Sequence, residues 1–294
     1  MVLPGKPVSR RKRQRLAHHA TESTPDERRV VDRRAGHRAG VYTAPVIPPT
    51  SALLAIDALF VAIAKGAGVS LATRLAEPGA AVARLVASLP ECDQRLLPAE
   101  ELQLVHRLDI GTSGLVLLSR GTEAHRALVE AFAARRVEKT YLAVVWGHPR
   151  PREGRWESPL GPDREDRRRM KVDPGGKPSR TAYRTLGVAP HVALVAMRAE
   201  TGRTHQLRVH LAAAGHPIVG DDLYGGPRHH GVRDRELRRL LDPGRPLLHA
   251  WRLTLPSPPL GVASALEAPW PADLGAVFDR CGWREALASH QMIW

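Results

Sequence analysis

The sequence predicts an α+β fold in which helices flank a central, mostly antiparallel sheet. Segments with the length and composition of β-strands outnumber those with helical periodicity. Several of these strands are joined by short connections, which favours antiparallel pairing because parallel strands need long crossovers. The chain has 294 residues, of which 43% are hydrophobic, enough for a sizeable core in one large domain or two small ones.

The first forty residues differ from the rest in charge. They contain eleven Lys or Arg and four Asp or Glu, a net of +7 out of the +14 of the whole chain. A segment with so little apolar surface cannot stabilise an ordered structure. Residues 1–45 are therefore predicted to be a disordered basic arm that contacts a polyanion such as RNA without sequence preference; a solvated tail is the alternative. Residues 46–294 are predicted to form the folded domain.

The elements of this domain follow from the spacing of its apolar residues. Residues 150–184, which are rich in Pro, Gly and Arg, are expected to form a long surface loop or hairpin. Strands are predicted at Leu53–Ala64 (two strands and a turn), Leu102–Val105, Leu115–Leu118, Lys139–Gly147, Val192–Ala199 and Leu247–Leu255. Helices are predicted within Thr73–Ser88, at Glu123–Arg135 with Thr122 as N-cap, at His205–Ala213 with Thr204 as N-cap, and at Asp273–Gly282.

The connection between the second and third of these strand segments carries a carboxylate, Asp109. Turn-forming residues from Ile110 to Gly114 follow it. Catalytic groups are often found on loops that a rigid sheet supports. Arg107, two residues earlier, can offer its guanidinium to a phosphate or to the carboxylate itself. Taken alone, these residues also fit a simple hairpin whose polar side chains form turn hydrogen bonds.

The charge of the chain indicates a polyanionic partner. The net charge is +14 and the pI is near 10.8. A membrane surface is the rival polyanion, but the sequence has no run of 18 apolar residues and no secretory signal, so neither a spanning helix nor export is expected. Cys92 and Cys281 lie far apart without metal-type spacing, which favours a reducing cytoplasm over a disulfide framework. No metal site is expected.

Three stretches together resemble the motifs of the RluA-type family of RNA pseudouridine synthases. They are HRLDIGTSGLVLLSR, FAARRVEKTYLAVVWG and TGRTHQLRVHLAAAGHPIVGDDLYGG, and they occur in the order of that family. The resemblance extends from about Ala52 to Leu274. It implies the pseudouridine synthase fold, a long bent sheet with a cleft across its middle, and makes residues 46–294 the catalytic domain. One departure is Gly66, where the family usually has Pro after the lysine.

The resemblance implies that the protein isomerises specific uridines to pseudouridine in structured RNA, ribosomal or transfer RNA, without a cofactor or metal. It is expected to act in the cytoplasm as a monomer. An RNA-binding protein that keeps the fold without the activity is the alternative from another class. The third hypothesis is a basic structural or ribosome-associated protein. This hypothesis predicts a basic surface without a carboxylate in a cleft.

The resemblance also assigns roles to single residues. Asp109 matches the catalytic aspartate, which can act by attack on the sugar, by attack on the base or by removal of a sugar proton. Tyr141 is expected to stack on the flipped uracil, with its hydroxyl assisting loss of the proton from carbon 5. Arg203 is expected to pair with Asp109. The predicted substrate-binding residues are Leu207 beneath the base, Arg107, which helps to replace the extruded nucleotide in the RNA helix or holds its phosphate, and His106 and Thr112 of the first motif.

Overall fold

The structure is a computed structural model, and it describes residues 51–73, 77, 79–256 and 264–289. The predicted basic arm, residues 1–45, lies outside the described residues, so the arm remains a prediction. No helix in the described part of the chain combines the length and the apolar character that crossing a membrane requires.

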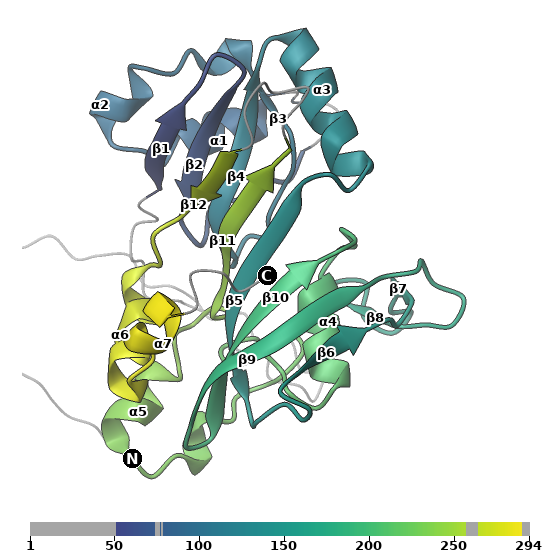
Figure 1. Ribbon diagram of the computed structural model, residues 1–294, viewed down its shortest axis with the longest axis vertical. Coiled ribbons are helices and arrows are strands. Elements are labelled where there is room, and N and C mark those ends of the chain that lie inside the picture. The colour runs from purple at the N-terminus through teal and green to yellow at the C-terminus, as the bar shows by residue number, and fades with distance from the viewer. Residues whose placement is uncertain (1–50, 74–76, 78, 257–263, 290–294) are drawn as a thin grey trace, which may run out of the picture. The chain divides into compact units, whose positions relative to one another are not determined.

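The core of the fold is a ten-stranded sheet with the strand order β1-β2-β4-β11-β5-β10-β9-β6, to which β3 adds on β4 and β12 on β11 (Figure 1). Two further strands, β7 and β8, form a small separate sheet. The strands are β1 Ala52–Ile56, β2 Phe60–Lys65, β3 Leu102–Leu104, β4 Ser113–Arg120, β5 Glu138–Trp146, β6 Glu153–Trp156, β7 Leu160–Pro162, β8 Met170–Val172, β9 Thr181–Ala189, β10 Val192–Ala199, β11 Leu248–Leu255 and β12 Ser264–Glu267. Only β4 and β11 pair in parallel, so the predicted mostly antiparallel sheet is confirmed.

The helices lie against this sheet, and several of them connect its strands in the sequence. They are α1 Ala80–Ala87, α2 Glu91–Gln94, α3 Thr122–Ala133, α4 Gln206–Ala213, α5 Arg235–Leu240, α6 Ala272–Cys281 and α7 Arg284–Ser289, with 3₁₀ turns at Ala99–Glu101 and His229–Gly231. The predicted N-caps were wrong by one residue. The cap of α3 is Gly121 and that of α4 is His205, both at positive φ. The shortest helices, α2, α5 and α7, were not predicted because they are too short to show a 3.6-residue period.

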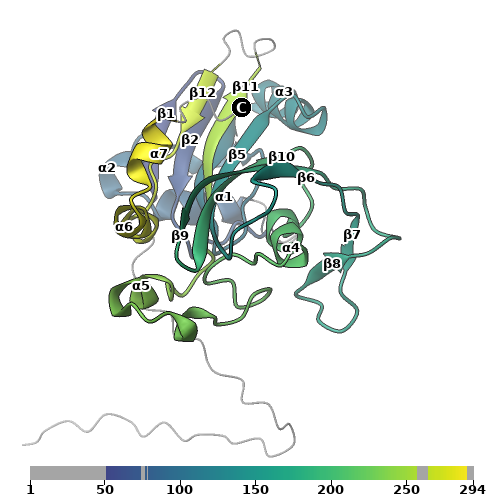
Figure 2. The ribbon, with the colours of Figure 1, turned by 60° about the horizontal axis from the view of Figure 1, so that its bottom comes forward.

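Side chains alternate along β5 between two cores. Leu142 and Val144 pack in a cluster with residues of α5, α6 and α7, whereas Ala143 and Val145 pack on the opposite face with Leu207 of α4. This placement of α4 and of α5–α7 on opposite sides of the sheet can be followed in Figure 2. Complete burial of each large aliphatic side chain contributes about 1.5–3 kcal/mol relative to exposure, so the two clusters hold β5 firmly between helices.

The sheet opens at the point where β4 meets β11. These strands pair only at His249↔Ser113 and Ala250↔Gly114; beyond them β4 pairs with β3 and β11 with β12. Gly114 makes the contact possible, because its φ is +114° and a Cβ there would lie 2.2 Å from the carbonyl oxygen of Ala250. The connection 105–112, which joins β3 to β4, lies at this opening and carries Asp109.

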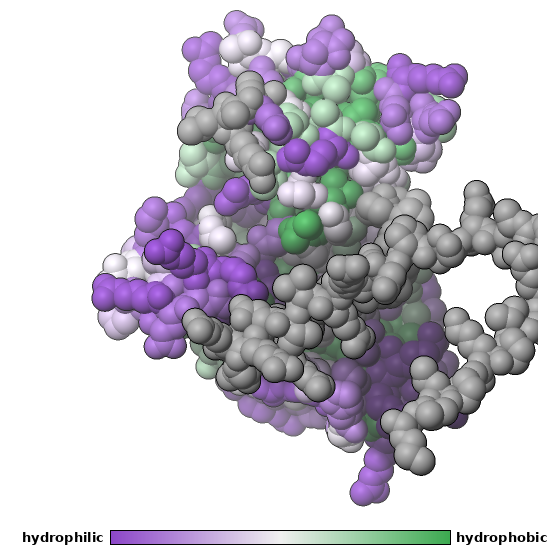
Figure 3. Space-filling view, turned by 180° about the vertical axis from the view of Figure 1, so that it is seen from behind, coloured by the Kyte–Doolittle hydropathy of each residue, from purple (hydrophilic) through white to green (hydrophobic). Residues whose placement is uncertain are grey.

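The predicted surface loop or hairpin over residues 150–184 contains β6, the small β7–β8 sheet and the start of β9. The segment from Asp163 to Arg169 joins β7 to β8. Hydrophilic side chains dominate this part of the surface, which lies at the left of Figure 3. Within it, Arg168 forms hydrogen bonds of 2.9 and 2.7 Å to the carboxylate of Asp166. Part of the charge is thus neutralised locally.

Candidate active site

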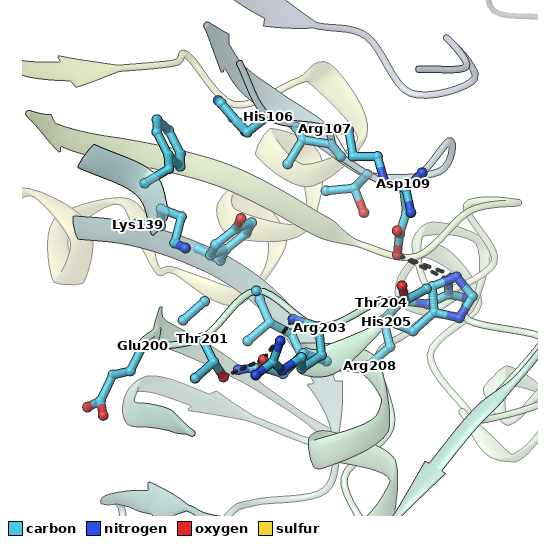
Figure 4. Close-up of a pocket in the computed structure, with 18 of the residues that line it drawn as sticks. His106, Arg107, Asp109, Lys139, Glu200, Thr201, Arg203, Thr204, His205 and Arg208 are labelled. Atoms are coloured by element: carbon cyan, nitrogen blue, oxygen red, sulfur yellow. Dashed lines mark hydrogen bonds and ion pairs between the residues drawn. The ribbon is translucent and has the colours of Figure 1, made fainter. Parts of the chain in front are cut away.

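One cavity collects the residues of all three motifs. Its volume is about 530 Å³, and its walls come from the β3–β4 connection, the end of α3, β5, and the turn from β10 into α4 (Figure 4). The residues predicted from the sequence all line it: His106, Arg107, Asp109, Thr112, Tyr141, Arg203 and Leu207. Segments separated by about one hundred residues thus meet at one site. Among the described residues, no group of three or more His, Cys, Asp or Glu side chains is placed to hold a metal ion.

Asp109 is held by the backbone of its own connection. Its carbonyl oxygen accepts a hydrogen bond of 3.0 Å from the N–H of Thr112, which closes the turn, and the next carbonyl, that of Ile110, accepts one of 2.7 Å from Gly68 N–H. The side chain of Asp109 is 31% exposed. The carboxylate therefore lies on a fixed backbone but remains open to the cavity.

Arg208, in the first turns of α4, is the charged partner of Asp109. Its Nη1 lies 3.4 Å from Asp109 Oδ2. Its Nε and Nη2 bind both oxygens of Asp221 at 2.7 and 2.8 Å, and the Asp221 side chain is 0% exposed. Burial disfavours the charged guanidinium, but the hydrogen bonds and charge of Asp221 outweigh it and raise the pKa of Arg208. A permanently charged Arg208 thus bridges a buried carboxylate and the open one.

The predicted pairing of Arg203 with Asp109 was wrong. Arg203 Nε donates to the carbonyl oxygen of Pro178 at 3.2 Å, although the residue does line the cavity. The reason is the start of α4: the helix begins at Gln206, so Arg203 lies in the preceding turn, where its N–H donates to the Gln206 side chain at 3.1 Å. Arg208 lies further along, on the helix. His205, the N-cap, lies directly before the helix, three residues ahead of Arg208.

His205 also faces Asp109 and was missed in the sequence. Its Nε2 lies 3.8 Å from Asp109 Oδ2, and its backbone is left-handed with φ +54°. Tyr224 Oη accepts a hydrogen bond from Met170 N–H at 2.8 Å and forms a second hydrogen bond of 2.8 Å with His205 Nδ1. Burial lowers the pKa of His205 more than Asp109 raises it, which favours the neutral ring.

Gln206 fixes the turn that presents these side chains. The residue is buried, and its side-chain oxygen accepts from the hydroxyl of Thr201 at 2.6 Å. Its side-chain nitrogen donates to the carbonyl oxygen of Arg180 at 2.9 Å and to Thr181 Oγ1 at 3.0 Å. The turn is therefore tied to both β9 and the end of β10, and the strained backbone of His205 is held in place by bonds on either side.

Tyr141 contributes a neutral phenol to the cavity wall. Burial, reinforced by the charge of Asp109, raises the pKa of Tyr141 far above that of a free tyrosine. Its hydroxyl makes no hydrogen bond to another residue in the described part of the chain. Since the phenolate is strongly disfavoured next to Asp109, the hydroxyl is available as a hydrogen-bond donor and its ring as an apolar surface.

We expect Tyr141→Phe to fold normally and to bind RNA as the wild type does, because only an unpaired hydroxyl is removed. If that hydroxyl takes part in the chemical step, single-turnover product formation should slow by about 10²–10⁴-fold. Thermal unfolding and RNA affinity measured on the same preparation serve as the controls. Turnover equal to that of the wild type would restrict Tyr141 to stacking.

The other predicted residues occupy different parts of the wall. Leu207 is 7% exposed and Thr112 is 3% exposed. The ring of His106 stacks on Phe132 with centroids 4.7 Å apart, and its Nε2 accepts from Leu117 N–H at 3.2 Å. Burial, followed by the charge of Lys139, lowers the pKa of His106 to about 3, so this ring is neutral. Arg107 is exposed at the rim, without an ion-pair partner among the described residues.

Lys65, at the end of β2, supports the connection that carries Asp109. It is only 1% exposed, and its Nζ donates to the carbonyl oxygens of Gly66, Val69 and Ile110 at 2.9, 3.2 and 3.3 Å. Burial and the charge of Arg245 outweigh the opposing effect of Asp109 and lower the pKa of Lys65 from 10.5 to about 7. The sequence suggested only a lysine before a turn, whereas the structure shows a buried cross-link.

This shift predicts a pH dependence of stability. Between pH 7 and pH 10.5 the unfolded chain holds a proton on Lys65 that the folded chain has lost, so the free energy of unfolding should rise with pH in this range. Lys65→Met lacks this contribution. We expect the stability of the wild type, relative to Lys65→Met, to increase by a few kcal/mol from pH 7 to pH 10. Urea denaturation at several pH values measures the difference, and a constant difference would contradict the shifted pKa.

Comparisons with known proteins show which family the chain resembles. A family model described as RNA pseudouridylate synthase matches residues 75–213. An uncharacterized RNA pseudouridine synthase of Chloroflexus aurantiacus is 45% identical over 174 residues, covering 59% of this chain and 52% of that protein. The dual-specificity RNA pseudouridine synthase RluA of Escherichia coli is 40% identical over 171 residues, covering 58% of this chain and 74% of that protein.

Among solved structures, human RNA Pseudouridylate Synthase Domain Containing 4 matches with a TM-score of 0.62 and 26% identity, covering 79% of this chain and 93% of that one. The matched region spans about half the length of the Chloroflexus relative, 52%. With three motifs in one cavity, the shared fold and the extent of the match to RluA, the chain belongs to the RluA-type family of RNA pseudouridine synthases.

Proposed function

We propose that the protein isomerises uridine to pseudouridine within RNA. The observation that supports this best is Asp109 itself, a carboxylate open to a cavity and backed by Arg208, with the phenol of Tyr141 in the same wall. In the reaction the bond from uracil N1 to the sugar breaks and a bond from C5 to the same carbon forms. C5 loses a proton and N1 gains one, so the atoms balance without a further reactant.

Asp109 is the residue that starts this reaction. An ionised carboxylate can attack the sugar carbon, add to the base or remove a sugar proton. Arg208 supports each of these, since its fixed guanidinium lies 3.4 Å from Asp109 Oδ2 and holds one carboxylate oxygen in place. A uridine stacked in RNA cannot reach a carboxylate inside the cavity, so the nucleotide must first be flipped out.

The RNA substrate is a structured one, ribosomal or transfer RNA. The net charge of +14 supports binding to a polyanion. The basic residues 1–45 add affinity without sequence preference, and the protein acts as a monomer in the cytoplasm. Its two cysteines, Cys92 and Cys281, are unpaired, in keeping with a reducing compartment.

The test compares pseudouridine in RNA from cells with and without the gene, and in RNA from the deficient cells treated with the purified protein. We expect one or a few positions to lose pseudouridine in the deficient cells and to regain it on treatment. Mapping these positions identifies the RNA. Binding to RNA without pseudouridine formation would favour the alternative, an inactive RNA-binding protein with the same fold.

A further inference from the structure

A second set of charges lines the cavity at the end away from Asp109. Lys139 of β5 and Arg135, just beyond α3, both belong to its wall. Figure 4 shows Lys139 and Asp109 on opposite sides of the cavity. Neither Lys139 nor Arg135 has a part in holding Asp109, and the chemistry proposed above makes no use of them.

Lys139 points into the cavity because of its position on the strand. Side chains alternate along β5, so Lys139 and Tyr141 share one face. The intervening Thr140 and the preceding Glu138 face the other way, and the Glu138 carboxylate lies 3.7 Å from Arg198. The acid nearest in sequence to Lys139 is thus directed away from it.

The Lys139 ammonium has no anionic partner among the residues that the structure describes. It lies 5.9 Å from the centroid of the Phe132 ring and 4.0 Å from the position a Cβ would take on Gly202. The one acid on this side of the cavity is Glu200, which binds Arg155 at 3.0 Å and lies 3.9 Å from Arg180.

Leaving such a cation without a partner is unfavourable. Burial, and after it the charge of Arg135, lowers the pKa of Lys139. The pKa of Lys65 is lowered as well, but Lys65 Nζ has three carbonyl oxygens within hydrogen-bond distance, whereas Lys139 has no such contact among the described residues. An anion that enters from outside would restore the balance of charge.

Together with Lys139, Arg135 makes the site suitable for an anion that contacts two cationic side chains. Its backbone is left-handed, with φ +58°, directly after the last turn of α3. It forms no ion pair within the described ranges, whereas its neighbour Arg136 binds Glu130 at 3.0 Å and does not line the cavity. Two unpaired cations beside the apolar Phe132 and Val129 suit a phosphate attached to a nucleotide better than a small hydrated anion.

We propose that Lys139 and Arg135 bind the phosphodiester next to the isomerised nucleotide, and so set which uridine of the strand reaches Asp109. This subsite rests on the function proposed above. The spacing agrees with it: Lys139 and Tyr141 are two residues apart on a strand, about 7 Å, which is comparable to the length of one nucleotide. With the uracil against Tyr141, the neighbouring phosphate reaches Lys139.

The test uses Asp109→Asn protein, so that binding is measured without turnover, and an RNA fragment that the wild type modifies. In this background Lys139→Met should weaken RNA affinity by about tenfold or more and reduce the salt dependence by about 0.7 in log–log slope. Lys139→Arg should restore most of the affinity. Arg136→Met is the matched control, since it removes a neighbouring surface charge, and should change affinity by less than about twofold.

A neutral methylphosphonate placed at single linkages around the target uridine locates the contact. At one linkage next to that uridine, the methylphosphonate should weaken binding to the protein that retains Lys139 about as much as Lys139→Met does. The same methylphosphonate should not further weaken binding to the Lys139→Met protein. Equal sensitivity of the two proteins at every linkage, or unchanged affinity of Lys139→Met, would overturn the subsite. Absence of pseudouridine formation by the wild type would instead overturn the proposed function.

A measurement on the unaltered chain covers the case in which Lys139→Met does not fold. The protein has only six lysines, so acetylation of each can be followed by mass spectrometry. Unmodified RNA should protect Lys139 from acetylation. RNA that carries the methylphosphonate should protect Lys139 less. Lys139 that reacts equally with and without bound RNA would contradict the proposal.

Discussion

Asp109→Asn should abolish pseudouridine formation, by at least about 10⁴-fold, while RNA affinity stays within about twofold of the wild type. The amide has the shape of the carboxylate but is neither nucleophile nor base. The fold should be unaffected, since Arg208 keeps both of its hydrogen bonds to Asp221 and the turn at Asp109 is made by its backbone. Single-turnover assays with excess enzyme, and affinity measured on the same RNA, separate the two quantities.

Asp57→Asn provides the control for this result. Asp57 is exposed in the turn between β1 and β2 and does not line the cavity, so its loss should leave turnover unchanged. Activity of Asp109→Asn within tenfold of the wild type would remove Asp109 from the chemistry. A large loss of RNA affinity would mean instead that Asp109 acts mainly in binding or structure.

Arg208→Leu should have the second largest effect, on both stability and activity. It leaves Asp221, which is 0% exposed, as a buried carboxylate without its cation. Breaking such a pair costs about 3–5 kcal/mol of unfolding free energy. Asp109 loses its charged partner as well, so turnover should fall by at least about 100-fold even where the protein is still folded.

A double variant separates these two effects. Replacing both partners, in Arg208→Leu/Asp221→Leu, removes the unpaired buried charge and should recover much of the stability but none of the activity. Arg203→Leu is the matched control, because it loses one hydrogen bond to the carbonyl of Pro178 and should reduce stability by no more than about 1 kcal/mol. Urea denaturation and single-turnover assays measure both quantities. A stable and active Arg208→Leu would disprove the role given to this bridge.

The sequence was sufficient for the position of Asp109 and for most of the longer elements, but it did not predict the nine-residue strand β9 or the shortest strands and helices. Local periodicity and turn residues predicted strands close to β3, β4, β5, β10 and β11, and the helices α3, α4 and α6, within a few residues. The three motifs also identified side chains that meet in one cavity. These features depend on short stretches of chain, where spacing determines which face a side chain occupies.

The partners within the site were not predictable in the same way. Arg203 and Arg208 belong to one motif, and the choice between them depends on where α4 begins, which a turn at His205 and the buried Gln206 decide. Asp221 binds Arg208, and Tyr224 binds His205. These partners are 13 and 19 residues apart in the sequence, too far for local spacing to predict the contacts. Burial of Lys65 was also hidden, since only the tertiary structure places three carbonyl oxygens around its ammonium.

The insertion of β11 between β4 and β5 determines when the cleft can assemble during synthesis of the chain. Asp109 precedes β4 and Tyr141 lies on β5, and the strand that joins β4 to β5 begins only at Leu248. A nascent chain that has left the ribosome as far as Gly226 already carries all three motifs, but its two half-sheets have no common neighbour. The cleft forms only after β11 has been made, so an interrupted chain retains basic residues that attract RNA but has no assembled site to act on it.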